Sequence, residues 1–299
     1  MLRGKGNKAM TGTALTTVLA AAFLHAGWNY LAKTSRNKLV FIWQFLFSAL
    51  IIYLPMFLYY WPKCSISFNG WVCIAMTGLL HFLYFWFLGG AYERGDLSLV
   101  YPLSRGAGPM FVPILALLFI HEKLSVMGSC GIALVVSGIY IIHLRSFSRQ
   151  SFLEPLRVLK ESASVWALCT GGTIAAYSIV DKIGVSLVDP PVYIYLMLVI
   201  TLVLLTPFVL KDGREPMFAE WRANKKAVIT VGFLVLGTYL MILFAFQIAK
   251  VSYVVAVRET SILFSVFYGI FRLKEKYGRQ KFVGAVFITC GVVFIGLAR

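Results

Sequence analysis

AYERGDLSLV at residues 91–100 returns as AFQIAKVSYV at residues 245–254. An alanine, an aromatic residue, a serine and a valine occupy matching places in the two stretches. The correspondence continues along the chain, with a gap of one residue: Glu122-Lys123 matches Glu275-Lys276, Gly131 matches Gly284, and Gly138 matches Gly291. Because the matches keep the same order, the sequence consists of two halves built on one plan.

The composition is that of a chain surrounded by lipid. Of its 299 residues, 60% are hydrophobic and only 13% are charged, which is too little charge to cover a water-facing surface. The apolar residues form continuous runs of about 20, the length that crosses the hydrocarbon core as a helix. Continuous runs exclude a porin-like barrel, whose strands alternate. We expect ten spans: 13–32, 39–61, 70–92, 97–119, 125–144, 162–181, 191–210, 227–248, 252–271 and 281–298.

Each half then contains five spans. The sequence predicts an all-α integral membrane protein of ten transmembrane helices, arranged as two five-helix repeats at 11–146 and 161–298. A polar, basic connector around 145–161 joins them. Because five is odd, the second copy enters the membrane from the opposite face. Such inverted repeats are the architecture of many secondary transporters, whose binding sites lie near the midplane where the halves meet.

The net charge of +16 belongs to the loops. Most of the 28 Lys and Arg residues follow odd-numbered spans, so the positive-inside rule predicts that both tails lie outside the cell. We interpret the basic loops as contacts with a lipid bilayer and expect no nucleic-acid partner. The five cysteines have no metal-binding spacing and are expected to pack as small apolar residues. We therefore expect no metal and no cofactor.

Two arginines stand in the middle of apolar spans, Arg105 and Arg258. A guanidinium in hydrocarbon costs at least a few kcal/mol, so it needs a partner or a watery cavity. The alignment of the halves matches Ser104 with Arg258 and Arg105 with Glu259, which predicts an asymmetric site between the repeats. The arginines would bind a carboxylate, phosphate or phosphonate through paired hydrogen bonds. The alternative is structural, with Arg105 paired to Glu259 or to helix carbonyls.

Glu259 is the one acidic residue that we expect deep inside a span. It either neutralises the arginines or exchanges a proton with the substrate, which would couple transport to the proton gradient. Consecutive helical residues point about 100° apart, so we expect only one of Arg258 and Glu259 to face the cavity.

Further polar and aromatic side chains complete the predicted substrate site. His25, Trp28 and Asn29 share one helix face, as a cavity wall or as a hydrogen-bonded lock on the first span. Tyr177, in the matching sixth span, would form the opposing wall. Tyr101 lies one turn before the arginine of span four, beside a proline that frees backbone groups. His81 stands among aromatic residues and is expected to pack rather than to bind a ligand.

The sequence resembles the EamA-type branch of the drug/metabolite transporter superfamily. The resemblance rests on HAGWN at 25–29, ERGDLSLVYPLSR at 93–105, the Glu-Lys pairs after spans four and nine, and the glycine-spaced fifth and tenth spans. It covers essentially the whole chain. It implies alternating-access movement of a small metabolite without ATP, in the cell membrane, the inner membrane of a bacterium. It also implies tails in the cytosol, against the charge count.

We therefore predict a secondary active transporter for a small anionic or zwitterionic metabolite, with a proton as the candidate coupling ion. The alternative is a non-transporting membrane subunit or receptor, which would explain the basic loops but not the repeat. An intramembrane enzyme would need a nucleophile–base pair or clustered metal ligands. The spans contain no GxSxG or HExxH motif and no paired aspartates, so we expect no enzyme activity.

Overall fold

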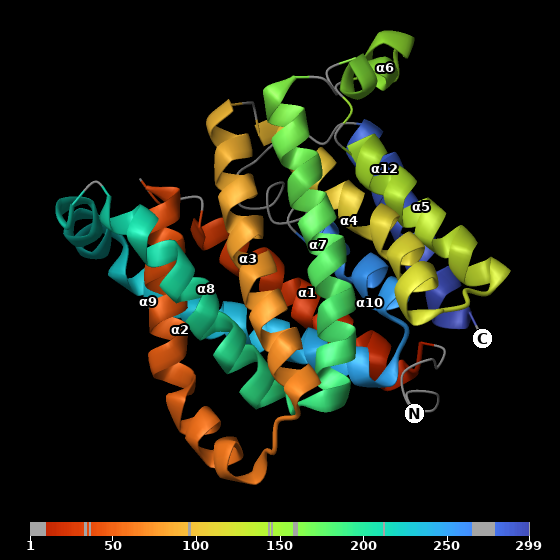
Figure 1. The fold of residues 1–299 in the computed structure, drawn as a ribbon. Coiled ribbons are helices and arrows are strands. Elements are labelled where there is room, and N and C mark those ends of the chain that lie inside the picture. The colour runs from red at the N-terminus through yellow and green to blue at the C-terminus, as the bar shows by residue number, and fades with distance from the viewer. Residues whose placement is uncertain are drawn as a thin grey trace.

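The computed structural model describes residues 10–32, 35, 37–94, 97–142, 144, 146–157, 161–211, 213–264 and 279–298, and these are helical without a strand. Figure 1 shows the arrangement of the helices. Their bounds are α1 Gly12–Ala32, α2 Lys38–Tyr60, the 3-10 turn η1 Trp61–Lys63, α3 Phe68–Arg94, α4 Leu97–Ile120, α5 Val126–Ile142, α6 Arg149–Arg157, α7 Ser162–Leu187, α8 Pro190–Leu210, α9 Glu215–Ile248, α10 Val251–Arg258 and α12 Arg279–Leu297.

The expected spans are recovered with one exception, and a simple count of ten is not confirmed. Within the described ranges, seven helices are long and apolar enough to cross a membrane, and two further apolar stretches, Gly12–Gly27 and Val126–Ile142, are shorter. The expected run 252–271 is not one continuous helix, because α10 ends at Arg258. The connector contains a helix of its own, α6.

The predicted end of the sixth span was wrong. The run 162–181 was expected to end at Asp181, but α7 continues for a further turn and a half to Leu187. Asp181 and Lys182 therefore lie inside a membrane helix. Glu259 is consequently not the only acid deep in a span. The apolar residues that follow Asp181 carry the helix on, and Val185, one turn further, is buried on the same face.

The glycines of α5 and α12 bring these two helices into backbone contact. A Cβ added at Gly138 would lie 2.7 Å from the carbonyl oxygen of Gly284, and one at Gly291 would lie 2.6 Å from that of Gly131. Only residues without a side chain permit this approach. The predicted close packing is confirmed. Because the residue numbers run in opposite senses along the contact, α5 and α12 are antiparallel, as Figure 1 shows on one flank of the molecule.

The junction between α9 and α10 is anchored by two charged side chains, Glu122 from the loop between α4 and α5 and Lys182 from α7. The carboxylate of Glu122 accepts hydrogen bonds from the backbone N–H groups of Val251 (2.9 Å) and Ser252 (3.2 Å), at the start of α10. Lys182 donates to the carbonyl of Ala249 at 2.7 Å. A carboxylate at a helix N-terminus and an ammonium at a helix C-terminus each interact favourably with the helix dipole and stabilise that end of the helix. These contacts set the position of α10, which carries Arg258.

The other end of α9 is anchored in the same way. Glu220, which is buried, accepts a hydrogen bond from the backbone N–H of Asn37 at 3.1 Å and from the amide of Asn224 at 2.7 Å. Asn37 in turn caps α2 by accepting from the backbone N–H of Val40. The long helix α9 is thus tied to the start of α2 near its N-terminal end and to Lys182 of α7 at its C-terminal end.

Candidate functional site

A cavity of about 90 Å³ lies between the helices and is lined from both halves of the chain. Its walls come from α1, α2, α3 and α4 of the first half and from α7, α8, α9 and α10 of the second. The antiparallel pair α5 and α12 contributes no lining residue. The lining combines two guanidinium groups, Arg105 and Arg258, with aliphatic side chains and an aromatic wall.

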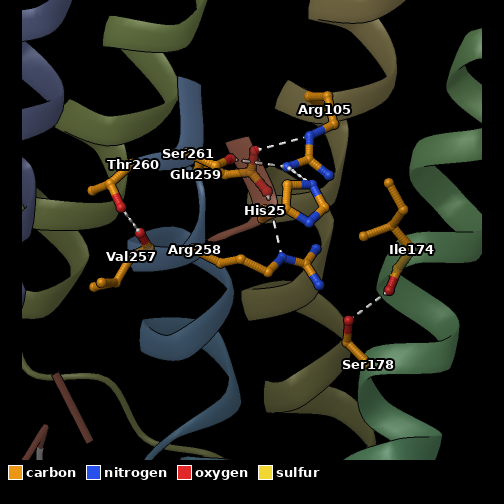
Figure 2. Close-up of polar contacts among 9 residues, drawn as sticks. All are labelled: His25, Arg105, Ile174, Ser178, Val257, Arg258, Glu259, Thr260 and Ser261. Atoms are coloured by element: carbon orange, nitrogen blue, oxygen red, sulfur yellow. Dashed lines mark hydrogen bonds and ion pairs between the residues drawn. The ribbon is translucent and has the colours of Figure 1, made fainter. Parts of the chain in front are cut away.

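Glu259 lies between the two arginines. Its Oε2 is 3.2 Å from Nε of Arg105, and its Oε1 is 3.7 Å from Nε of Arg258. All three residues are at least 93% buried, so water screens these charges little. Figure 2 shows the carboxylate reached by one guanidinium from each half. Two positive charges and one negative charge leave the cluster with a net charge of +1.

The helix break places Glu259 at this point. Glu259 ends α10, and its N–H bonds to carbonyls three and two residues earlier rather than continuing the helix. The hydroxyl of Thr260 donates to the carbonyl of Val257 at 2.8 Å (Figure 2). Helical structure resumes at Ser261. Irregular backbone at membrane depth is tolerated where it is buried in protein or lines a cavity, and transporters place such breaks at their binding sites.

Arg105 is held from several directions. Its Nη2 lies 3.4 Å from Nε2 of His25 and donates to Oγ of Ser261 at 3.3 Å. The structural pairing of Arg105 with Glu259, which the sequence left open, is therefore present. Figure 2 shows the imidazole of His25 between the two guanidiniums.

Arg258 is held less completely. Its Nη2 has no hydrogen-bond partner in the part of the chain that the structure describes. Its ion pair with Glu259 is longer than that of Arg105. Arg258 lines the cavity, while its Nη2 is itself buried.

The aromatic wall joins α3, α7 and α9. The ring of His81 stacks on Tyr177 with centroids 4.2 Å apart, and Tyr239 meets His81 edge-on at 5.3 Å. Tyr84 contacts Tyr177 in a T-shaped arrangement. His81 is packed, as predicted, but it also lines the cavity.

Comparison with known proteins gives the family. The sequence model of the EamA-like transporter family matches twice, at residues 12–144 and 161–297. The chain belongs to the EamA-like transporter family. No curated protein matches it. A solved structure described only as "Crystal structure of protein" superposes with a TM-score of 0.69 at 13% identity, covering 95% of each chain, which shows a shared fold. This EamA-like transporter is thus a multi-pass membrane protein.

Five of the residues predicted for the site come together in this EamA-like transporter: His25, Arg105, Tyr177, Arg258 and Glu259. All but Glu259 line the cavity, and Glu259 lies behind the arginines. The side chains of three others, Trp28, Asn29 and Tyr101, lie outside the described residues.

Asp181, His81 and Tyr239 were missed as site residues. The available signal for Asp181 was its position one helical turn after Tyr177, on the same face. It was not predicted because it lies at the end of an apolar run, where a charged residue resembles the start of a loop. Among the described residues, no group of three or more His, Cys, Asp or Glu could hold a metal ion.

Proposed function

We propose that this EamA-like transporter is a secondary active carrier, which moves a small anionic or zwitterionic metabolite across the membrane by alternating access. One observation carries the proposal. Arg258 lines a cavity beside a charge cluster that retains one positive charge. A substrate carboxylate, phosphate or phosphonate would neutralise that charge and form paired hydrogen bonds.

Alternating access is supported by the two-fold repetition. The cavity draws on four helices of each half, and the equivalent helices α5 and α12 cross antiparallel. We therefore propose ten membrane crossings as two inverted five-helix repeats, with the broken helix at Glu259 as one crossing. Rocking of one half against the other would open the cavity to each side in turn.

The cavity dimensions limit the substrate. At about 90 Å³, the cavity is below the roughly 300 Å³ at which pockets for drug-sized ligands begin. The proposed cargo is accordingly a small metabolite. Tyr177 and His81 offer a flat surface and polar edges beside Arg258. Residence in a bacterial inner membrane stays a prediction.

The test is a thermal-shift screen of small carboxylates, phosphates, phosphonates and amino acids in detergent, followed by counterflow in proteoliposomes. We expect Arg258→Ala to abolish the shift and the transport, and Arg258→Lys to retain weakened binding, since it keeps the charge but loses the paired geometry. Arg94→Ala, which removes a partly exposed arginine outside the cavity, is the matched control. Wild-type transport by a folded Arg258→Ala protein would refute the anion site.

A further inference from the structure

A second buried acid lies beside the cavity, away from the arginines. Asp181 of α7 is completely buried. Its Oδ1 accepts hydrogen bonds from the hydroxyls of Thr77 (2.5 Å) and Tyr193 (2.9 Å), and its Oδ2 accepts one from the hydroxyl of Tyr239. The three donors belong to α3, α8 and α9, so one carboxyl group ties α7 to three neighbours.

The surroundings of Asp181 differ from those of Glu259 in charge. Glu259 has two guanidiniums within 4 Å, whereas Asp181 has no Lys, Arg or His nitrogen within that distance in the described ranges. An ionised carboxylate without a cation is costly in a low-dielectric interior, and a bound proton removes the cost. The titratable groups that face Asp181 are Cys73 and His81 on α3, Tyr193 on α8 and Tyr239 on α9.

Two short hydrogen-bonded routes connect Asp181 to the cavity. In the first, Oγ1 of Thr77 lies 3.1 Å from Nδ1 of His81, whose ring lines the cavity. In the second, Tyr239 both lines the cavity and donates directly to Asp181. Asp181 itself is not a lining residue. A proton can therefore reach Asp181 from cavity water, while the substrate cannot.

We propose that Asp181 is the proton-binding residue of this transporter and that it takes up its proton together with the anionic substrate. The proposal rests on the proposed function. With Asp181 ionised, the charges of Arg105, Arg258, Glu259 and Asp181 sum to zero. A substrate anion at Arg258 adds one negative charge, and protonation of Asp181 restores neutrality. Binding of either ligand thus strengthens binding of the other, which is the requirement for symport.

Protonation also changes the contacts that hold the wall. The ionised carboxylate accepts three hydroxyl hydrogen bonds, but a protonated carboxyl group has a donor on one oxygen. At least one of the three hydroxyls must then turn away or accept instead. In the proposed cycle, the proton joins a carboxyl oxygen of Asp181 from water on one side and returns to water on the other. The O–H bond is the only bond made and broken.

The experiment is an infrared titration of the purified full-length protein, which needs no substrate. We expect a protonated-carboxyl C=O band at acidic pH that disappears as the pH rises. The band should be lost in Asp181→Asn, which retains a hydrogen-bond acceptor, and kept in Asp189→Asn, a control at an exposed aspartate of the next loop. It should also survive in Glu259→Gln, because we assign Glu259 to the arginines.

Two results would overturn the proposal. One is the absence of any Asp181-dependent band across the titration of a folded protein. The other is loss of the band in Glu259→Gln with retention in Asp181→Asn. A cooperative thermal unfolding transition establishes that each variant is folded. Because the titration involves no transport, a failed substrate screen would count against the proposed function alone.

Discussion

The Arg105–Glu259 ion pair makes a prediction about which single change the protein tolerates. Replacing Glu259 by Met leaves two guanidiniums close together without their shared counter-ion. Replacing Arg105 by Met instead leaves Glu259 with Arg258, 3.7 Å away. The charge of the cluster, +1 in the native protein, becomes +2 in the first variant, 0 in the second and +1 in the double variant.

The magnitude follows from burial and distance. At 3.2 Å and an effective dielectric constant of about 20, the attraction of the pair is about 5 kcal/mol. Removing one partner of a buried pair typically costs about 3–5 kcal/mol. We expect Glu259→Met to lose about 4 kcal/mol of unfolding free energy. Arg105→Met should lose less, because Glu259 keeps Arg258. Adding Arg105→Met to Glu259→Met should restore about 2 kcal/mol of unfolding free energy.

The assay is denaturant unfolding of all four proteins in mixed micelles, analysed as a double-mutant cycle. An interaction energy of about 3 kcal/mol is expected, at the upper end for contacting residues. The control is the same cycle on Glu93 and Arg94, which lie 3.6 Å apart but whose side chains are 79% and 41% exposed. Exposed pairs contribute at most about 1 kcal/mol, so this cycle should be nearly additive.

Additivity at Arg105 and Glu259 would refute the reasoning. If the double variant were as unstable as the two single losses combined, the residues would not share a buried electrostatic interaction. Arg105 would then be available as a substrate ligand in its own right, and the assignment of Arg258 as the principal anion-binding residue would have to be revised.

Two further predictions concern the helices around the cavity, and both are checked by unfolding in the same micelles. Glu122→Ala removes both acceptors at the start of α10. It should lower the free energy of unfolding by about 3–6 kcal/mol, since hydrogen bonds to charged groups contribute about 1.5–3 each. Glu122→Gln should recover part of this loss, and an Ala variant of native stability would contradict the cap. Gly291→Ala places a methyl group against the backbone of α5. It should lower the free energy of unfolding by about 1–3 kcal/mol. Gly172→Ala is the control, because a Cβ added there has nothing within 4 Å. It should raise the free energy of unfolding by up to about 1 kcal/mol through helix propensity. Equal effects of the two substitutions would count against the close crossing of α5 and α12.

Much of the fold is predictable because membrane helices obey local rules. Runs of about 20 apolar residues predict spans, since every backbone polar group must be satisfied within the helix. The glycine positions of α5 and α12 likewise predict a close crossing, which the contacts of Gly138 and Gly291 confirm. The break at Glu259 was not predictable from hydropathy, because the segments on both sides of residues 258–261 are apolar and together have the length of one span.

The candidate site was also predictable only in part. Arg105 and Arg258 are conspicuous in the sequence because an intramembrane charge is rare and expensive. The partner of each depends on side-chain directions and on a backbone turn that hydropathy does not encode. Asp181 was overlooked because a charge at the end of an apolar run resembles a loop residue. Asp181 lies inside a membrane helix only because α7 continues for another turn and a half beyond it.

The sequence alone therefore determines the helices and marks the two arginines, because placing polar groups in hydrocarbon is costly. It also shows the two halves, because their residues match in order. Packing in three dimensions decides that Glu259 binds both arginines, that Arg258 lines the cavity, and that Asp181 accepts hydrogen bonds from hydroxyls of three helices. Those contacts join residues distant in the chain. Their geometry arises only when the two halves close around a common cavity.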